Sequence, residues 1–166
     1  MPEKETIERA QEDARKGKAP STQAGEFVRE EIEHIREGKH GARSTKQAIA
    51  IGLSKARRAG VKLPPPKEGK ATTETRQQAS RDYEKGQKSP AQKPSPTRSK
   101  ATLSALQQEG SEAASHEELS RQAENSAKSR SASDRSLAAK KAVATKGPEG
   151  VKRAARKAAR TRTAGG

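Results

Sequence analysis

The chain has 166 residues, of which 28% are hydrophobic, 1% aromatic and 34% charged, and its mean hydropathy is −1.18. This composition excludes one large hydrophobic core, because too few bulky apolar side chains are present to offset the entropy of ordering the chain. The lack of cysteine excludes disulfides and thiolate metal sites, and the formal net charge of +15 favours a polyanionic partner.

Two helices are predicted in the acidic N-terminal part of the chain. Residues 2–17 begin with a proline, carry acidic residues early and basic residues late, and end at a glycine, which is the usual order in a short helix. Its apolar stripe is short, so we expect a marginal helix and a linker within residues 1–25. The next segment has apolar residues at helical spacing and predicts a better-defined helix: Phe27, Val28, Ile32 and Ile35.

The clearest helix is predicted for residues 44–60. Ser44 and Gln47 form the S-x-x-Q pattern of an N-terminal capping box, and Gly60 stands where helices end in a left-handed residue. The predicted apolar stripe consists of Ile49, Leu53 and Ala56, widened by Ile51. Because neither predicted stripe can be buried alone, we expect the two helices to pack as an αα-hairpin over residues 26–63.

The rest of the chain carries weaker signals. Residues 64–100 are predicted to be a Pro/Ser/Lys-rich linker with one weak helix, and residues 101–126 to form short acidic helices. Residues 127–166 form a basic Lys/Arg/Ala tail with two segments of high helix propensity, the second with Pro148 near its first turn. The predicted fold class is mostly α with extensive disorder: a short αα-hairpin plus isolated marginal helices, and no β-sheet.

Basic residues are concentrated in two blocks. Residues 38–70 contain nine Lys/Arg and one acidic residue, and residues 127–166 contain twelve Lys/Arg and two acidic residues. This local excess predicts contacts with phosphate groups, and the alternative for each block is a solvated, solubilising charge. The expected nucleic-acid-binding residues are Arg43, Lys46, Lys55, Arg57, Arg58, Lys62, Lys140, Lys141, Lys152, Arg153, Arg156, Lys157 and Arg160. Because aromatic residues that stack on bases are almost absent, we expect backbone contacts without base specificity, to DNA in preference to RNA.

No catalytic or metal-binding pattern is recognised in the sequence. His34, His40 and His116 are interpreted as isolated, solvated side chains. The segment GKHGARST resembles a phosphate-binding loop but lacks the spacing of one. We therefore expect no enzymatic activity, no small-molecule substrate, no cofactor and no metal ion.

Two segments resemble known groups of proteins. The stretch HIREGKHGARSTKQAIAIGLSKARRAG resembles small, uncharacterised, basic bacterial proteins with the core S-x-K-Q-A-I-A-I-A-L-S-x-A. The matching residues are Ser44, Lys46, Gln47, Ala48, Ile49, Ala50, Ile51, Leu53, Ser54 and Ala56, with Gly52 where alanine is more common. This resemblance implies no activity. The segment AAKKAVATKGPEGVKRAARKAAR is similar in composition to the Lys/Ala tails of bacterial histone H1-like proteins, which implies binding to DNA.

These features predict a cytoplasmic, nucleoid-associated accessory protein that binds nucleic acid non-specifically. No membrane partner is expected, because the chain has no long apolar run and the face opposite the basic residues of the tail is alanine. The first alternative is a hydrophilin-like stress or desiccation protein, for which the same low hydropathy is expected. The second is an interaction module whose αα-hairpin docks on a protein partner through Phe27, Ile32, Ile35, Ile49 and Leu53.

Overall fold

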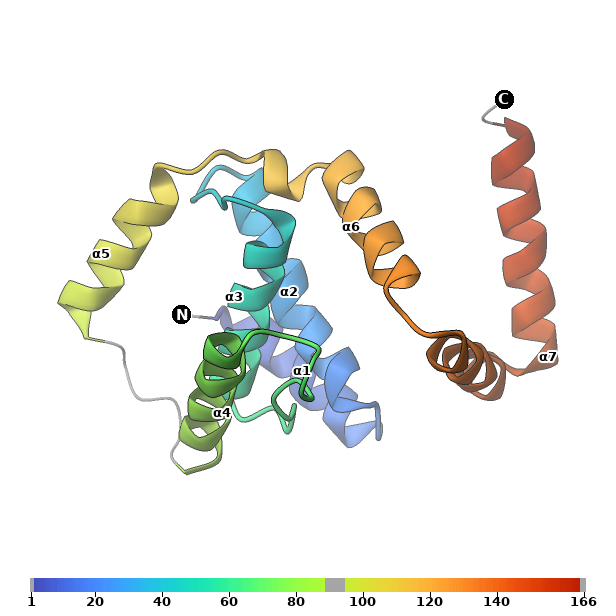
Figure 1. Ribbon diagram of the computed structural model, residues 1–166, viewed down its shortest axis with the longest axis horizontal. Coiled ribbons are helices and arrows are strands. Elements are labelled where there is room, and N and C mark those ends of the chain that lie inside the picture. Colours follow the sequence, from blue (N-terminus) through green and yellow to red (C-terminus); the bar gives the residue numbers. More distant parts are fainter. Residues whose placement is uncertain (1, 89–94, 165–166) are drawn as a thin grey trace. The chain divides into compact units, whose positions relative to one another are not determined.

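The computed structural model describes residues 2–88 and 95–164. Over these ranges the chain is mostly helical and has no β-strand, as the sequence predicts. The elements are α1 (Lys4–Arg15), α2 (Pro20–Arg36), α3 (Thr45–Arg58), α4 (Thr73–Lys88), α5 (Pro96–Gln107), the 3-10 turn η1 (Glu112–Ala114), α6 (His116–Lys128) and α7 (Ala132–Ala164) (Figure 1). The chain divides into two compact units between residues 122 and 123.

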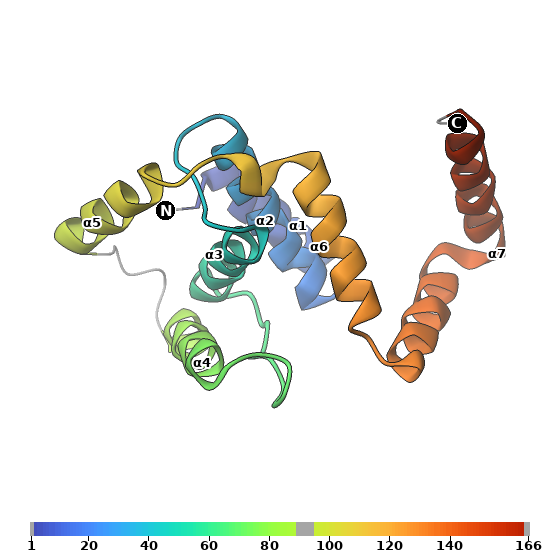
Figure 2. The same ribbon diagram turned by 45° about the horizontal axis from the view of Figure 1, so that its top comes forward.

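The first unit is built on the predicted αα-hairpin. Helices α2 and α3 pack against each other, α1 packs on α2, and α4 packs on α3, so each of the four helices contacts the next in chain order (Figure 1 and Figure 2). The sequence did not predict that α1 and α4 join the hairpin. Helix α2 also begins earlier than predicted, at Pro20. Proline is favoured at the first helical position, because a backbone N–H there would have no acceptor within the helix.

Local signals set both ends of α3 as predicted. The backbone N–H of Gln47 donates to Ser44 Oγ at 3.2 Å. The Gln47 side-chain oxygen accepts from the backbone N–H of Arg43 at 2.7 Å, one residue before the usual capping-box partner. At the other end Gly60 has φ 93°, and Val61 folds back and is buried. The helix therefore begins and ends through contacts between residues close in sequence.

The buried stripe of α3 includes the predicted Ala56, but in the first turns it lies one position before the predicted residues. Its small buried residues are Thr45, Ala48, Gly52 and Ala56. A Cβ at Gly52 would lie 2.7 Å from the Cα of Val28, so the backbones of α2 and α3 approach closely at a position where no side chain stands between them. Ile49 is half-buried and belongs to neither apolar cluster, because this close approach directs the small residues, rather than the large ones, towards α2.

Apolar side chains gather in two clusters within the first unit. One consists of Ile32, Ile35, Ala42, Ala48, Ala113 and Ala114. The other consists of Ala10, Ala24, Phe27, Ala56 and Val61. The first cluster includes both alanines of η1, and the Thr45 hydroxyl donates to the Ala113 carbonyl at 2.7 Å. The turn therefore covers the loop end of the hairpin, across a long separation in sequence.

A buried carboxylate fixes α4 on α3. Asp82 is 1% exposed and accepts hydrogen bonds from Ser54 Oγ at 2.6 Å, Arg58 Nε at 2.7 Å and Gln78 Nε2 at 3.0 Å. Two of these donors belong to α3 and one to α4 itself. Because a buried carboxylate with several donors is well satisfied, Asp82 can stand in place of an apolar contact between these two helices.

Helices also form in segments for which the sequence predicts disorder. Helix α4 is the weak helix predicted within residues 64–100, whereas α5 begins inside the predicted linker, at Pro96. Residues 89–94 of that linker lie outside the described residues. Helices α5 and α6 have no buried residue, although Leu119 of α6 is partly buried against the first apolar cluster, so these helices depend largely on local propensity.

The basic tail is one long helix with a break where the sequence predicts two segments. Gly147 has φ 67° and ψ 169°, which is not helical, and Pro148 begins the second segment. Figure 2 shows the two segments of α7 joined at a bend. The side chains on both segments are almost all exposed over residues 132–161. No helix within the described ranges is long and apolar enough to cross a membrane.

Candidate functional site

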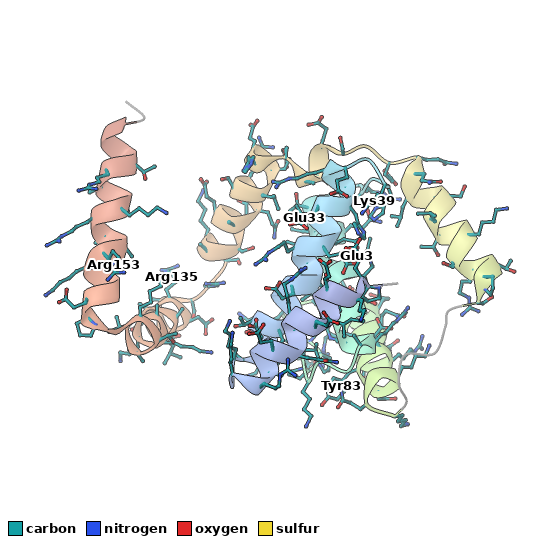
Figure 3. The ribbon with its side chains drawn as sticks, turned by 180° about the vertical axis from the view of Figure 1, so that it is seen from behind. Glu3, Glu33, Lys39, Tyr83, Arg135 and Arg153 are labelled. Carbon is teal, nitrogen blue, oxygen red and sulfur yellow. The ribbon has the colours of Figure 1, made fainter. Side chains whose placement is uncertain are left out.

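The predicted binding residues of the tail lie exposed along α7. Those in the first segment are Lys140 and Lys141, and those in the second are Lys152, Arg153, Arg156, Lys157 and Arg160. Figure 3 labels Arg135 and Arg153 on the two segments. In the second segment the basic residues follow at intervals of one and three, which places them on one side of the helix, opposite alanines. The tail thus presents a cationic helical face with little apolar surface.

Like charges on this face stand one helical turn apart. The i, i+4 pairs are Lys152 with Arg156, Arg153 with Lys157, and Arg156 with Arg160. Such pairs destabilise a helix by a few tenths of a kcal/mol each, in the opposite sense to an ion pair. Glu149 supplies a counter-charge on this helix, because its Oε1 lies 2.8 Å from Lys152 Nζ. Phosphate groups on this face would relieve the repulsion and favour the helix.

Lys55 is directed at two buried carboxylates rather than at solvent alone. Its Nζ lies 2.5 Å from Glu31 Oε2 and 3.8 Å from Glu30 Oε1. Both glutamates belong to α2 and are almost fully buried. Lys55 therefore supplies positive charge across the α2–α3 interface, which the isolated sequence of α3 does not reveal.

The two arginines at the end of α3 also have partners within the first unit. Arg57 is buried, and its guanidinium donates to the carbonyls of Leu63 at 3.2 Å and Pro64 at 3.5 Å. Burial lowers the pKa of the Arg57 guanidinium from its ordinary value. Arg58 Nε lies 2.7 Å from Asp82 Oδ1. Phosphate binding by Lys55 and these arginines stays a prediction, whereas their contacts give them a structural role.

The other three predicted residues of the first basic block are exposed. The Arg43 side chain is 81% exposed, and its Nε lies 3.6 Å from Glu109 Oε1. Lys46, near the start of α3, and Lys62, beyond its end, are also exposed. Of the predicted set in this block, Lys55 and Arg57 are therefore directed into the first unit, whereas Arg58 is half exposed beside Asp82 and the remaining cations lie on the surface.

Two histidines lie together at the end of α2, contrary to their interpretation as isolated and solvated. His34 is on α2 and His40 is in the loop that follows, and their ring centroids are 6.0 Å apart with the rings at 88°. Their side chains are 13% and 8% exposed. The interpretation is wrong because the loop returns His40 to the surface of α2. His116 is exposed, as predicted.

Glu3 joins this group from the segment before α1. His34 Nε2 donates to Glu3 Oε1 at 2.9 Å, and Lys39 Nζ donates to the same oxygen at 3.3 Å. Figure 3 shows Glu3 and Lys39 close to each other at this end of the unit. The hydrogen bond from His34, followed by that from Lys39, lowers the pKa of Glu3 from its ordinary value. The N-terminal segment is thereby tied to the loop between α2 and α3.

Two carboxylate oxygens beside the histidines lack a hydrogen-bond donor. They are Oε1 of Glu30 and Oε1 of Glu31, and both are buried. His40 Nε2 lies 3.4 Å from Glu31 Oε1, and His34 Nε2 lies 4.0 Å from Glu30 Oε1. We call Glu30, Glu31, His34 and His40 the Glu/His cluster. The signal in the sequence was Glu31-x-x-His34 on one helical turn, but its second histidine could be recognised only from the path of the loop.

The comparisons with known proteins reach only part of the chain. Residues 3–68 match a family of unknown function (DUF6496). This range contains α1, α2 and α3 together with the Glu/His cluster, and it excludes α7. The match agrees with the resemblance of this part to uncharacterised proteins and does not extend to the likeness of the tail to histone H1-like proteins. No curated protein and no solved structure gives a significant match to the chain.

Proposed function

We propose that the protein binds nucleic acid non-specifically through the exposed basic face of α7, with phosphate groups as the ligands. The observation that carries this proposal is the row of exposed cations in the second segment of α7, spaced so that several face the same side. DNA is the expected polymer, and such binding places the protein on the nucleoid, in the cytoplasm.

The chemistry of the face favours phosphate over bases and membranes. Arginine and lysine bind phosphate oxygens well, and each neutralised phosphate releases counterions. The helix has no aromatic residue to stack on a base, and the side opposite the cations is mainly alanine, which offers little apolar surface to insert into lipid. The alanines stabilise a helix without needing a core, so the tail can remain exposed until a polyanion binds.

The first unit has a separate part in this proposal. Its exposed cations Arg43, Lys46 and Lys62 can add contacts, while Lys55, Arg57 and Arg58 hold the fold. Each contact with a phosphate group releases counterions, so the contributions of the contacts to the binding affinity are approximately additive. Deleting the tail should therefore weaken binding more than removing any single cation of the first unit.

Removal of the tail is expected to weaken binding to every DNA sequence alike. Deleting residues 147–166 removes six Lys/Arg and one acidic residue. Each lost phosphate contact lowers the slope of log K against log salt by about 0.9, so the slope should become flatter by several units. Fluorescence anisotropy with two unrelated DNA duplexes, measured between about 50 and 200 mM salt, provides the slopes.

A matched pair of charge variants distinguishes binding by the basic face of α7 from a non-specific effect of the net charge. The first variant changes Arg153, Arg156 and Lys157 to glutamine, and the second changes Lys4, Arg15 and Lys16, which are exposed on and beside α1. Both lose the same formal charge, and glutamine retains good helix propensity. We expect the slope to fall by about two to three in the first variant and to change little in the second. Equal effects, or an affinity insensitive to salt, would instead favour a solubilising tail and the hydrophilin-like alternative.

A further inference from the structure

We propose that Glu31, His34 and His40 form a binding site for a divalent transition-metal ion, with Zn²⁺ as the expected metal. One ligand atom from each of these residues lies within 4.8 Å of the other two. The three residues come from α2 and from the loop after it, so a bound ion would fasten this loop to the helix. This site is independent of the proposed contacts between the tail and nucleic acid.

The hydrogen bond made by His40 Nδ1 leaves Nε2 of the same ring available to bind a metal ion. Its Nδ1 lies 3.1 Å from the carbonyl oxygen of Gly41, and a carbonyl only accepts, so Nδ1 carries the proton. In the neutral ring Nε2 is then unprotonated, and it lies 3.4 Å from Glu31 Oε1. Metal-binding histidines commonly have this arrangement, in which a backbone carbonyl fixes the tautomer and orientation of the ring.

Glu31 offers an acceptor that the protein leaves without a donor. Its Oε1 is buried and has no hydrogen-bond partner, although His40 Nε2 lies 3.4 Å away. Two acceptors facing each other in a buried place are unfavourable unless a positive charge lies between them. Ligand atoms of a tetrahedral zinc site lie about 3.3–3.4 Å apart, given Zn–N bonds of about 2.0–2.1 Å. The observed separation of these two atoms therefore fits two ligands of one ion.

His34 supplies the third ligand after a change of partner. Its Nε2 now donates to Glu3 at 2.9 Å. On metal binding the ion takes the place of the proton on Nε2, and the neutral ring keeps its proton on Nδ1. One proton is released if Nδ1 already carries one, and otherwise the proton moves between the ring nitrogens. Glu3 is about half exposed and already beside Nε2, so its carboxylate can provide a fourth ligand.

The charges around the cluster also favour a cation. Three carboxylates, from Glu3, Glu30 and Glu31, surround the histidines, while the neighbouring lysines are Lys39 and Lys55. With neutral histidines this group carries one excess negative charge, much of it buried. Two imidazoles and a carboxylate are typical ligands of Zn²⁺, whereas Mg²⁺ and Ca²⁺ prefer sites made of oxygen atoms alone.

Metal titration of the full chain tests this site. The protein is purified without a histidine tag, treated with a chelator, and titrated with Zn²⁺ in competition with a chromophoric indicator. We expect one Zn²⁺ per chain, and at least about tenfold weaker binding in His34→Gln and His40→Gln. The matched control is His116→Gln, which removes the exposed third histidine on α6 and should leave the affinity unchanged.

A second measurement separates loss of the site from loss of the fold. Far-UV circular dichroism is recorded for each variant, and Glu31→Gln, which retains the side-chain shape, is included in case a histidine variant unfolds. Zn²⁺ should raise the Tm of the parent chain and of His116→Gln, but not that of a folded His40→Gln or Glu31→Gln variant. The proposal is overturned if the parent chain does not compete with the indicator, or if His116→Gln loses as much affinity as the cluster variants.

Discussion

Replacing Phe27 by alanine is expected to unfold the first unit under conditions in which the parent chain is folded. Phe27 is 1% exposed and is the largest member of a cluster whose other buried residues are alanines and a valine. Loss of a buried phenylalanine typically costs about 3–5 kcal/mol in the free energy of unfolding. In a unit with so few bulky apolar residues this is a large part of the stability available. Denaturant unfolding followed by far-UV circular dichroism measures the loss.

The matched control for Phe27→Ala is Ile49→Ala on the facing helix. Ile49 belongs to the apolar stripe predicted from the sequence, but it is half-buried and lies outside both apolar clusters. Its replacement should therefore cost clearly less free energy than that of Phe27. Equal losses of stability in the two variants would mean that Ile49 contributes as much to the core as Phe27. That result would contradict the packing of α2 on α3 and would favour the stripe predicted from the sequence.

Replacing Lys55 by alanine is expected to destabilise the first unit although lysine is usually a surface residue. The variant leaves the buried carboxylate of Glu31 without its closest positive charge. Removing one partner of a buried ion pair costs on the order of 3 kcal/mol, because the other charge remains buried. Thermal and denaturant unfolding of Lys55→Ala, compared with the parent chain, measure this cost.

Lys46→Ala is the control for this second prediction, because Lys46 is exposed on the same helix. Its effect should stay within about 0.5 kcal/mol. A double variant of Lys55→Ala with Glu31→Gln should recover part of the loss, since the amide carries no charge to be neutralised. Equal stability of the Lys55 and Lys46 variants would show that Lys55 is an ordinary surface cation and remains available for phosphate.

The ends of several helices could be predicted because capping depends on neighbours in sequence. The contacts of Ser44 with Gln47, and of Ser115 with Glu118, join residues three positions apart. Gly60 adopts a positive φ where the sequence predicts the end of a helix. Such contacts form in the same way whatever the rest of the chain does.

The pairing of α2 with α3 could also be predicted, but its details could not. Two amphipathic helices joined by a short loop have few alternatives to packing on each other. Which face of α3 is buried depends on how closely the backbones approach, and the approach at Gly52 depends on Val28, far away in sequence. The apolar pattern indicated Ile49, whereas the fit between the two helices buries Ala48 and Gly52 in line with the predicted Ala56.

The sequence by itself determined the helical class, both ends of α3, and the two blocks of positive charge, because composition, capping and charge are properties of single residues and their near neighbours. Only the tertiary structure decided what those residues contact. It paired Lys55 with Glu31 and Arg58 with Asp82, and it brought His40 back to α2 beside Glu31. Each of these contacts joins residues that are separated along the chain and meet only when the helices pack, so no local pattern could reveal them.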